Sequence, residues 1–331
     1  MAFFSFSTSP LTRLIPGSRS KATGTKRRLS STIASIERSP GIIALDGPFT
    51  HDHVSVRGIR LHLAEAGSPT KPLVLLIHGA FGGWYDYREV IGPLADAGFH
   101  VAAIDLRGYG MSDKPPTGYD LRHAAGELSS VIAALGHDDA LLVGSDTGAS
   151  IAWAIASMYP ERVRGLISLG AIHPLDMRRA IRRKPHLHVS DLSRLAPFRL
   201  PSFLHNLFHF GITSAARREI VNNTSSSYQR SNAFTETVLL RKKALSIDHT
   251  ITPIIRTNRY LVGSIPSKTV SAPVWLLRTN TRRWEHLANT ARTRTTGPFT
   301  TIAIPGGYEL PYLENPSEFA ATIAEFARTT F

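Results

Sequence analysis

Residues 141–149 read Leu-Leu-Val-Gly-Ser-Asp-Thr-Gly-Ala, an apolar run that leads directly into a predicted helix. Glycines stand two residues before and two residues after Asp146, at Gly144 and Gly148. A sharp turn from a strand into a helix needs such residues, because no Cβ then crowds the side chain at its apex. The spacing predicts that the Asp146 carboxylate is presented at the edge of a sheet, where it can act as a nucleophile.

Strand and helix patterns alternate on both sides of this turn. Continuous apolar runs are typical of strands that are buried on both faces. The predicted strands are 54–56 and 59–64 (a hairpin), 73–77, 101–104, 140–143, 163–169, 274–277 and 300–304, and the predicted helices are 87–97, 120–135, 148–158 and 316–328. This order predicts an α/β fold whose mostly parallel sheet is flanked by helices.

A polar, helical stretch over residues 174–271 interrupts the alternation. We therefore expect a core formed by residues 46–173 and 272–331, with 174–271 inserted as a helical cap. Such a cap covers the carboxyl ends of the strands, where open α/β sheets bind ligands. Residues 1–45 are basic, rich in Ser and Thr and without a sustained period, which predicts a disordered extension; an organellar transit peptide is the alternative.

The net charge of +13 over 331 residues is unevenly distributed. Residues 1–40 hold seven Lys and Arg against one acid, and residues 174–265 hold fifteen against five. A solvated surface with counter-ions explains this charge. The alternative is that the tail and the cap make peripheral contact with an anionic membrane. No nucleic-acid motif accompanies the charge, so we predict no nucleic-acid partner.

Other classes of chemistry find no support in the composition. The chain has no cysteine, which excludes thiol catalysis, disulfides and cysteine-bound metals. We expect neither a metal nor a cofactor. No apolar run approaches the roughly 18 residues of a membrane span, and no secretory signal is visible, so a cytoplasmic protein is expected. The sequence carries no signal for an oligomeric state.

Further motifs follow the predicted strands at regular places. His-Gly-Ala-Phe-Gly-Gly-Trp at 78–84 follows the first buried strand, and Asp-Leu-Arg-Gly-Tyr-Gly-Met-Ser-Asp at 105–113 follows the second. The Asp146 turn follows the third, and Tyr-Pro-Glu-Arg-Val stands at 159–163. As a set, these motifs resemble the α/β-hydrolase superfamily. The resemblance is closest to the epoxide hydrolase and haloalkane dehalogenase branch, whose nucleophile is an aspartate.

The resemblance implies roles for several residues. Asp146 would attack a substrate carbon and form an alkyl-enzyme ester, and a helix-capping Asp is the alternative. The backbone N–H groups of Phe81 and Thr147 would form the oxyanion hole. Tyrosines of the cap protonate the opening oxygen in epoxide hydrolases; Tyr228 and Tyr260 are the candidates, with simple packing as the alternative. Support for the elbow and the loop would come from Gly144, Gly148, His78 and Gly79.

One motif departs from the family. Its catalytic histidine follows the last strand in a Pro-Gly-x-Gly-His-x-Pro sequence, whereas residues 305–311 read Pro-Gly-Gly-Tyr-Glu-Leu-Pro. Glu309 stands at the histidine position. The loop at 278–284, where an orienting acid is usual, has no carboxylate. We therefore expect weak water activation, with Glu309 as a base only if burial raises its pKa.

Two functions stay open at this point. The first is a slow hydrolase of epoxides or related esters that binds a small apolar molecule under the cap. The second is a catalytically degenerate protein, a pseudoenzyme that uses the fold to bind an apolar ligand or a protein partner.

Overall fold

The computed structural model describes residues 39–196, 209–304 and 308–331. Residues 1–38, nearly all of the predicted basic extension, lie outside the described residues, as do residues 305–307 of the motif that contains Glu309. The end of the predicted extension is described: Pro40–Ile43 form a 3-10 helix, η1, and the Ile43 side chain is buried. These last residues therefore belong to the folded unit.

Eight strands of the described residues form one sheet in the order β1-β2-β4-β3-β5-β6-β7-β8. The pairs β1–β2 and β2–β4 are antiparallel, and every other neighbouring pair is parallel. The strands are β1 (Thr50–Val56), β2 (Ile59–Ala66), β3 (Leu73–Ile77), β4 (His100–Ile104), β5 (Ala140–Ser145), β6 (Val163–Leu169), β7 (Val274–Arg278) and β8 (Phe299–Ala303). The predicted α/β fold with a mostly parallel sheet is confirmed.

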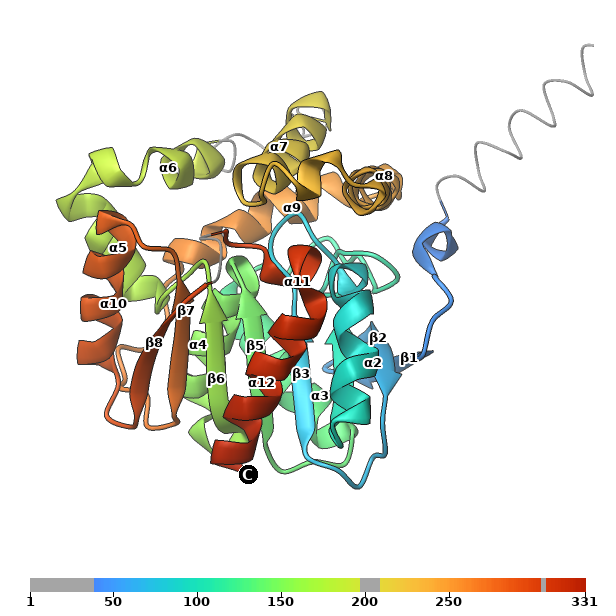
Figure 1. Ribbon diagram of the computed structural model, residues 1–331, viewed down its shortest axis with the longest axis horizontal. Helices are drawn as coiled ribbons and strands as arrows, with labels where there is room; N and C mark the ends of the chain where they lie inside the picture. Colours follow the sequence, from blue (N-terminus) through green and yellow to red (C-terminus); the bar gives the residue numbers. More distant parts are fainter. Residues whose placement is uncertain (1–38, 197–208, 305–307) are drawn as a thin grey trace, which may run out of the picture. The chain divides into compact units, whose positions relative to one another are not determined.

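Helices cover both faces of this sheet. Leu73, Leu75 and Ile77 of β3 pack in one core with α3 (Leu121–Ala134) and α4 (Thr147–Met158). Val74 and Leu76, which point the other way, pack with α2 (Arg88–Asp96) and α12 (Pro316–Thr330) (Figure 1). Burial on both faces explains the continuous apolar runs at 73–77, 101–104 and 140–143, which lie within β3, β4 and β5.

The insert between β6 and β7 is helical in its described part. Its helices are α5 (Pro174–Arg183), η4 (Pro185–Leu187), α6 (Val189–Leu195), α7 (His209–Asn222), η7 (Tyr228–Arg230), α8 (Asn232–Ser246), α9 (Ile251–Thr257) and η8 (Asn258–Val262). Figure 1 shows α6, α7 and α8 over the carboxyl ends of the strands, whereas α5 lies beside α10 (Arg282–Arg294). The remaining short elements are η2 (Trp84–Tyr87), η3 (Pro160–Arg162) and α11 (Pro311–Glu314).

A buried arginine joins the cap to the core. Arg241 of α8 donates from Nη2 to Oδ2 of Asp86 in η2, at 2.9 Å, and from Nη1 to Oε2 of Glu219 in α7, at 2.6 Å. Its side chain is 3% exposed. One guanidinium therefore pairs with a buried carboxylate, Asp86, and with a partly exposed one, Glu219, from different parts of the chain.

The structure adds one fact about membranes. Across the described ranges, no helix combines the length and the apolar character that a bilayer crossing needs. A cytoplasmic location, and contact of the basic cap with an anionic membrane, remain predictions.

Candidate active site

Asp146 stands at a sharp turn between β5 and α4. Its backbone has φ 54° and ψ −117°, a conformation that non-glycine residues rarely adopt and that is typical of functional sites. The turn is tight on both sides. A Cβ on Gly144 would lie 2.6 Å from the backbone of Ala149, and a Cβ on Gly148 would lie 2.3 Å from the carbonyl oxygen of Ile77. Both glycines are therefore required sterically.

The loop after β3 lies against this turn, because β3 and β5 are neighbouring parallel strands. The backbone N–H of Ala80 donates to Oδ2 of Asp146 at 3.1 Å. A Cβ on Gly79 would lie only 3.0 Å from the Asp146 Cβ, so the close approach of this loop needs glycine. The amide that contacts the carboxylate is thus that of Ala80, one residue before the predicted Phe81.

His78 fixes the position of this loop. Its Nδ1 lies 2.7 Å from the carbonyl oxygen of Gly79, and its Nε2 accepts from the backbone N–H of Leu106 at 3.1 Å. Both ring nitrogens are therefore occupied, and burial lowers the pKa of the imidazole. His78 therefore links the loop to Leu106 and has no free nitrogen for proton transfer.

An arginine from the cap holds the Asp146 carboxylate. Arg194, at the end of α6, donates from Nη1 to Oδ1 at 2.9 Å and from Nη2 to Oδ2 at 2.6 Å. The guanidinium is itself positioned, since its Nε donates to Oδ1 of Asn258 at 3.1 Å and its plane lies over the Phe81 ring at 5.3 Å. Such a planar fork matches both oxygens of a carboxylate. Phe81 therefore contacts the site through its ring.

These contacts decide the charge of Asp146. Burial alone would raise the pKa of its carboxyl group, but Arg194 and the backbone N–H groups of Ala80 and Thr147 hold the pKa below its usual value. Burial also opposes the charge of Arg194, yet Asp146 holds the pKa of the guanidinium above its usual value. Both groups are ionised at neutral pH. Asp146 stands at the N-cap position of α4, but its side chain makes no capping hydrogen bond there.

Glu309 is partly buried and contacts another partner. Its Oε1 accepts from the indole Nε1 of Trp284 at 2.6 Å. Burial raises the pKa of its carboxyl group, and Arg283 and the indole N–H offset part of that rise. Asp146 also raises this pKa through its charge, so the two carboxyl groups influence one another without a hydrogen bond between them.

No histidine whose side chain the structure describes forms a hydrogen bond or ion pair with Asp146. His173 directly precedes α5, the first helix of the insert. It is fully buried, and neither of its ring nitrogens has a hydrogen-bond partner. Asp176, which follows His173 at the start of α5, is held by Arg294, whose Nε and Nη2 each lie 2.8 Å from one of its oxygens. Both residues therefore have structural roles at the start of α5.

His173 gives a testable pH dependence. Burial, together with the charge of Arg294, lowers its pKa from 6.5 to about 4. The unfolded chain therefore binds a proton between these values that the folded chain does not, so stability is lost as the pH falls from 6.5 towards 4. From pH 7 to pH 5 we expect this residue to lower the free energy of unfolding by about 2 kcal/mol. Urea titrations should show a smaller loss for His173→Leu, and equal losses in both proteins would contradict this assignment.

The two predicted cap tyrosines do not contact Asp146. The Tyr228 hydroxyl lies 3.0 Å from Oγ1 of Thr237, and Tyr228 lines a cavity of about 580 Å³ between η7, α8 and α11 that does not include Asp146. Tyr260 of η8 is buried, and burial raises the pKa of its hydroxyl well above the usual value.

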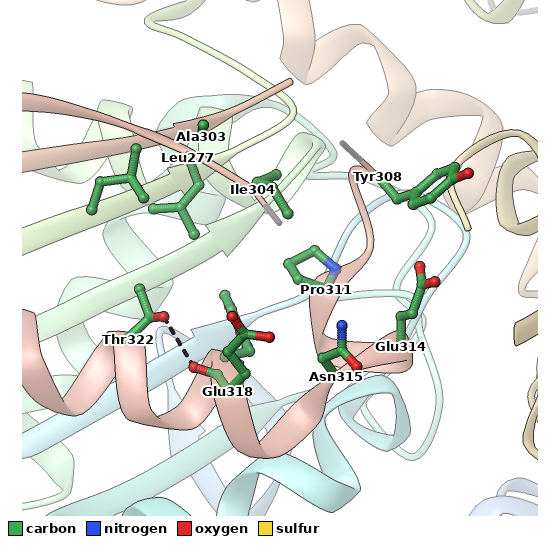
Figure 2. A pocket seen from close by; sticks show the side chains of 11 residues that line it. Leu277, Ala303, Ile304, Tyr308, Pro311, Glu314, Asn315, Glu318 and Thr322 are labelled. Atoms are coloured by element: carbon green, nitrogen blue, oxygen red, sulfur yellow. Dashed lines mark hydrogen bonds between the residues drawn. The ribbon is translucent and has the colours of Figure 1, made fainter. Parts of the chain in front are cut away.

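A second, water-sized cavity of about 30 Å³ lies between β7, β8 and α12, lined by Leu277, Tyr308 and Glu318 among others (Figure 2).

Residues 72–274 match the model of the alpha/beta hydrolase fold family. The chain belongs to this family. The matched segment contains β3 to β6, the Asp146 turn and the cap.

This α/β-hydrolase is similar to epoxide hydrolases in sequence. It is 38% identical to epoxide hydrolase 1 of Caenorhabditis elegans over 131 residues, which cover 39% of this chain and 32% of that protein. It is 37% identical to epoxide hydrolase 4 of Mus musculus over 140 residues, covering 41% and 39%. An AB hydrolase superfamily protein, YfhM of Bacillus subtilis, is 36% identical over 150 residues, covering 45% and 52%. The chain thus spans between about a third and half of the length of these relatives.

Solved structures show the same fold. Epoxide hydrolase A from Mycobacterium thermoresistibile superimposes with a TM-score of 0.65 at 23% identity, over 85% of this chain and 98% of that one. A putative acyltransferase from Salmonella enterica superimposes with a TM-score of 0.73 at 22% identity, over 86% and 96%. At these identities the likeness concerns the fold of the α/β-hydrolase.

Two contacts of this site were not predicted from the sequence. The amide that contacts Asp146 is that of Ala80, one residue before the predicted Phe81. Alignment of the motif on Gly79, which lies against the turn, would have identified it. Arg194 lies in a polar helix among many other basic residues, and nothing local distinguishes it from a surface arginine. No group of three His, Asp or Glu side chains suited to a metal ion occurs in the part of the chain that the structure describes.

Proposed function

We propose that this chain is an epoxide-reactive α/β-hydrolase in which Asp146 forms an ester with its substrate and in which release of that ester is impaired. The observation that carries the proposal is the asymmetry of the site. The Asp146 carboxylate accepts from the Ala80 amide at a strained turn, whereas Glu309, which the sequence motif aligns with the family's histidine, is bonded to Trp284.

The contacts of the carboxylate support the first half-reaction. A carboxylate has about four lone-pair sites, two on each oxygen. Oδ2 accepts from the Ala80 amide and from Arg194, and Oδ1 accepts from Arg194, while the Thr147 amide also stabilises the charged carboxylate. These three donors leave one of about four lone-pair sites for attack on carbon. The amide contact on Oδ2 is suited to hold the carbonyl oxygen of the ester.

The second half-reaction needs a base that activates water. General-base catalysis is typically worth about 10²–10⁴ in rate, and loss of one member of a cooperating set can cost about 10⁶. A carboxyl group that accepts an indole N–H is a weaker base than an oriented imidazole, even with a raised pKa. We therefore expect hydrolysis of the ester to be far slower than its formation.

The similarity to proteins named epoxide hydrolases supports the choice of an epoxide, or a related ester, as the electrophile. An epoxide also suits the site chemically, because ring strain allows a carboxylate to open it without prior activation by a histidine. The proposed ligand is a small, mostly apolar molecule under the cap, with no cofactor.

Binding without covalent chemistry is the second candidate. It is favoured by the Arg194 fork, which neutralises Asp146 and lowers its reactivity in the resting state. In that case the fold would serve as a pseudoenzyme for an apolar ligand or a protein partner.

The number of epoxide molecules consumed per chain distinguishes the covalent reaction from binding alone. With excess styrene oxide and other aryl or alkyl epoxides, we expect about one equivalent of epoxide to be consumed per chain, followed by almost no further loss. Gas chromatography of the epoxide and its diol makes the measurement. Continued diol formation over many equivalents would establish a working hydrolase, and no consumption with any probe would favour the binding protein.

A further inference from the structure

Resting on the proposed function, we propose that Arg194 takes the place of the cap tyrosines as the group that stabilises the oxygen of the opening epoxide. Of the described cap residues, it is the one with hydrogen bonds to Asp146, and neither Tyr228 nor Tyr260 has such a bond. It is thus a catalytic residue that the sequence did not identify.

Charge conservation gives the physical reason. When Oδ1 of Asp146 attacks an epoxide carbon, an Oδ1–C bond forms and the C–O bond of the ring breaks. The bonding pair stays on the ring oxygen, which becomes an alkoxide and then takes a proton from water, releasing hydroxide. Asp146 is neutral once it is an ester, so Arg194 loses the anion that it was paired with.

The Arg194 side chain is 21% exposed, and a guanidinium that is largely removed from solvent is unfavourable without a counter-charge. The alkoxide carries the charge that left Asp146. It forms on the carbon next to the one that is bonded to Oδ1. Arg194 can therefore exchange one anion for the other while it stays protonated throughout. Its position is suited to this exchange, because Asn258 holds Nε and the Phe81 ring supports the guanidinium plane, leaving both Nη atoms directed at the reacting oxygens.

The neighbouring charges keep Arg194 from finding another anion. Asp191, one turn earlier on α6, is bonded to both His188 and Arg283. Glu219 is bonded to Arg241. Since these carboxylates already have cationic or imidazole partners, the anion produced by the reaction is the natural new partner of Arg194.

The proposal predicts that the effect of Arg194 depends on the charge of the leaving group. An epoxide produces an anion, whereas a dialkylbenzylsulfonium probe transfers its benzyl group and releases a neutral thioether. For Arg194→Gln we expect alkylation of Asp146 by styrene oxide to slow by about 10²-fold, the scale of one lost donor to a developing oxyanion. Alkylation by the sulfonium probe should stay equal or become faster, because the carboxylate is no longer paired.

Intact-mass spectrometry over time, with peptide mapping of Asp146, gives both rates. Arg194→Lys keeps the positive charge and should recover part of the epoxide rate, and it serves as the second variant if Arg194→Gln does not fold. Arg283→Gln is the matched control: it removes an ion pair that docks the same helix, α6, but touches neither oxygen of Asp146. It should leave the ratio of the two rates unchanged.

The outcomes are distinct. An Arg194→Gln protein that reacts with styrene oxide as fast as the unmodified chain, or faster, would overturn the role of Arg194 while the proposed function stands. A parallel slowing with both probes, or the same change of ratio in Arg283→Gln, would assign Arg194 a purely structural role. No adduct on the unmodified chain with either probe would refute the proposed function itself, and this inference with it.

Discussion

Asp146→Asn is expected to abolish formation of the covalent adduct. The amide oxygen carries no negative charge, and removal of a nucleophile from a cooperating set costs up to about 10⁶ in rate. The same change leaves Arg194 without its anion, so we also expect the free energy of unfolding to fall by roughly 1–3 kcal/mol. Intact-mass spectrometry after incubation with an epoxide measures the first effect, and urea denaturation measures the second.

A matched substitution far from the site controls for the loss of a carboxylate. Asp139→Asn removes an acid whose Oδ2 pairs with Arg164 at the surface, at 2.8 Å. That variant should form the adduct at the rate of the unmodified chain. An adduct of equal yield on Asp146→Asn, mapped to another residue, would show that Asp146 is not the nucleophile.

Arg241→Met is expected to give the largest loss of stability. The substitution leaves two carboxylates, the buried Asp86 and the partly exposed Glu219, without the cation that bonds both. Breaking a buried ion pair from one side typically costs about 3–5 kcal/mol, because an uncompensated charge stays buried. The effect should depend on pH. Burial already raises the pKa of Glu219, and removal of Arg241 raises it further, so stability is lost as the pH rises and Glu219 ionises.

Urea denaturation at pH 5 and pH 8 measures this effect. The control is Lys242→Met, an exposed neighbour on the same helix, which should change the free energy of unfolding by less than about 0.5 kcal/mol. If Arg241→Met costs less than about 1 kcal/mol at pH 8, the cap does not depend on this ion pair.

Much of the fold could be predicted from local patterns in the sequence. The predicted hairpin turn at Arg57 and Gly58 has positive φ at both residues, 49° and 80°, as a two-residue turn of this kind requires. The runs at 73–77 and 140–143 form strands because residues of both parities are apolar, and the structure buries both faces. Such signals depend only on residues that are neighbours in the sequence, so they can be recognised from a single sequence.

The turn at Asp146 was predictable for the same reason. Two glycines at fixed distances encode the close approach of α4 and of the loop after β3 to the turn. The partner of Asp146 was not predictable, because Arg194 is 48 residues away in sequence and meets it only when α6 is placed over the sheet. The contact of Glu309 with Trp284 is of the same kind, since it joins the segment after β8 to α10, the helix that follows β7.

The ester on Asp146 is expected to form and then to persist. A pulse of epoxide, removal of the excess by gel filtration, and intact-mass spectrometry of the chain over the following hours test this directly. We predict one added epoxide mass per chain, located on the peptide that contains Asp146, with little loss over that time. A return to the unmodified mass within minutes, with one equivalent of diol released, would contradict the account.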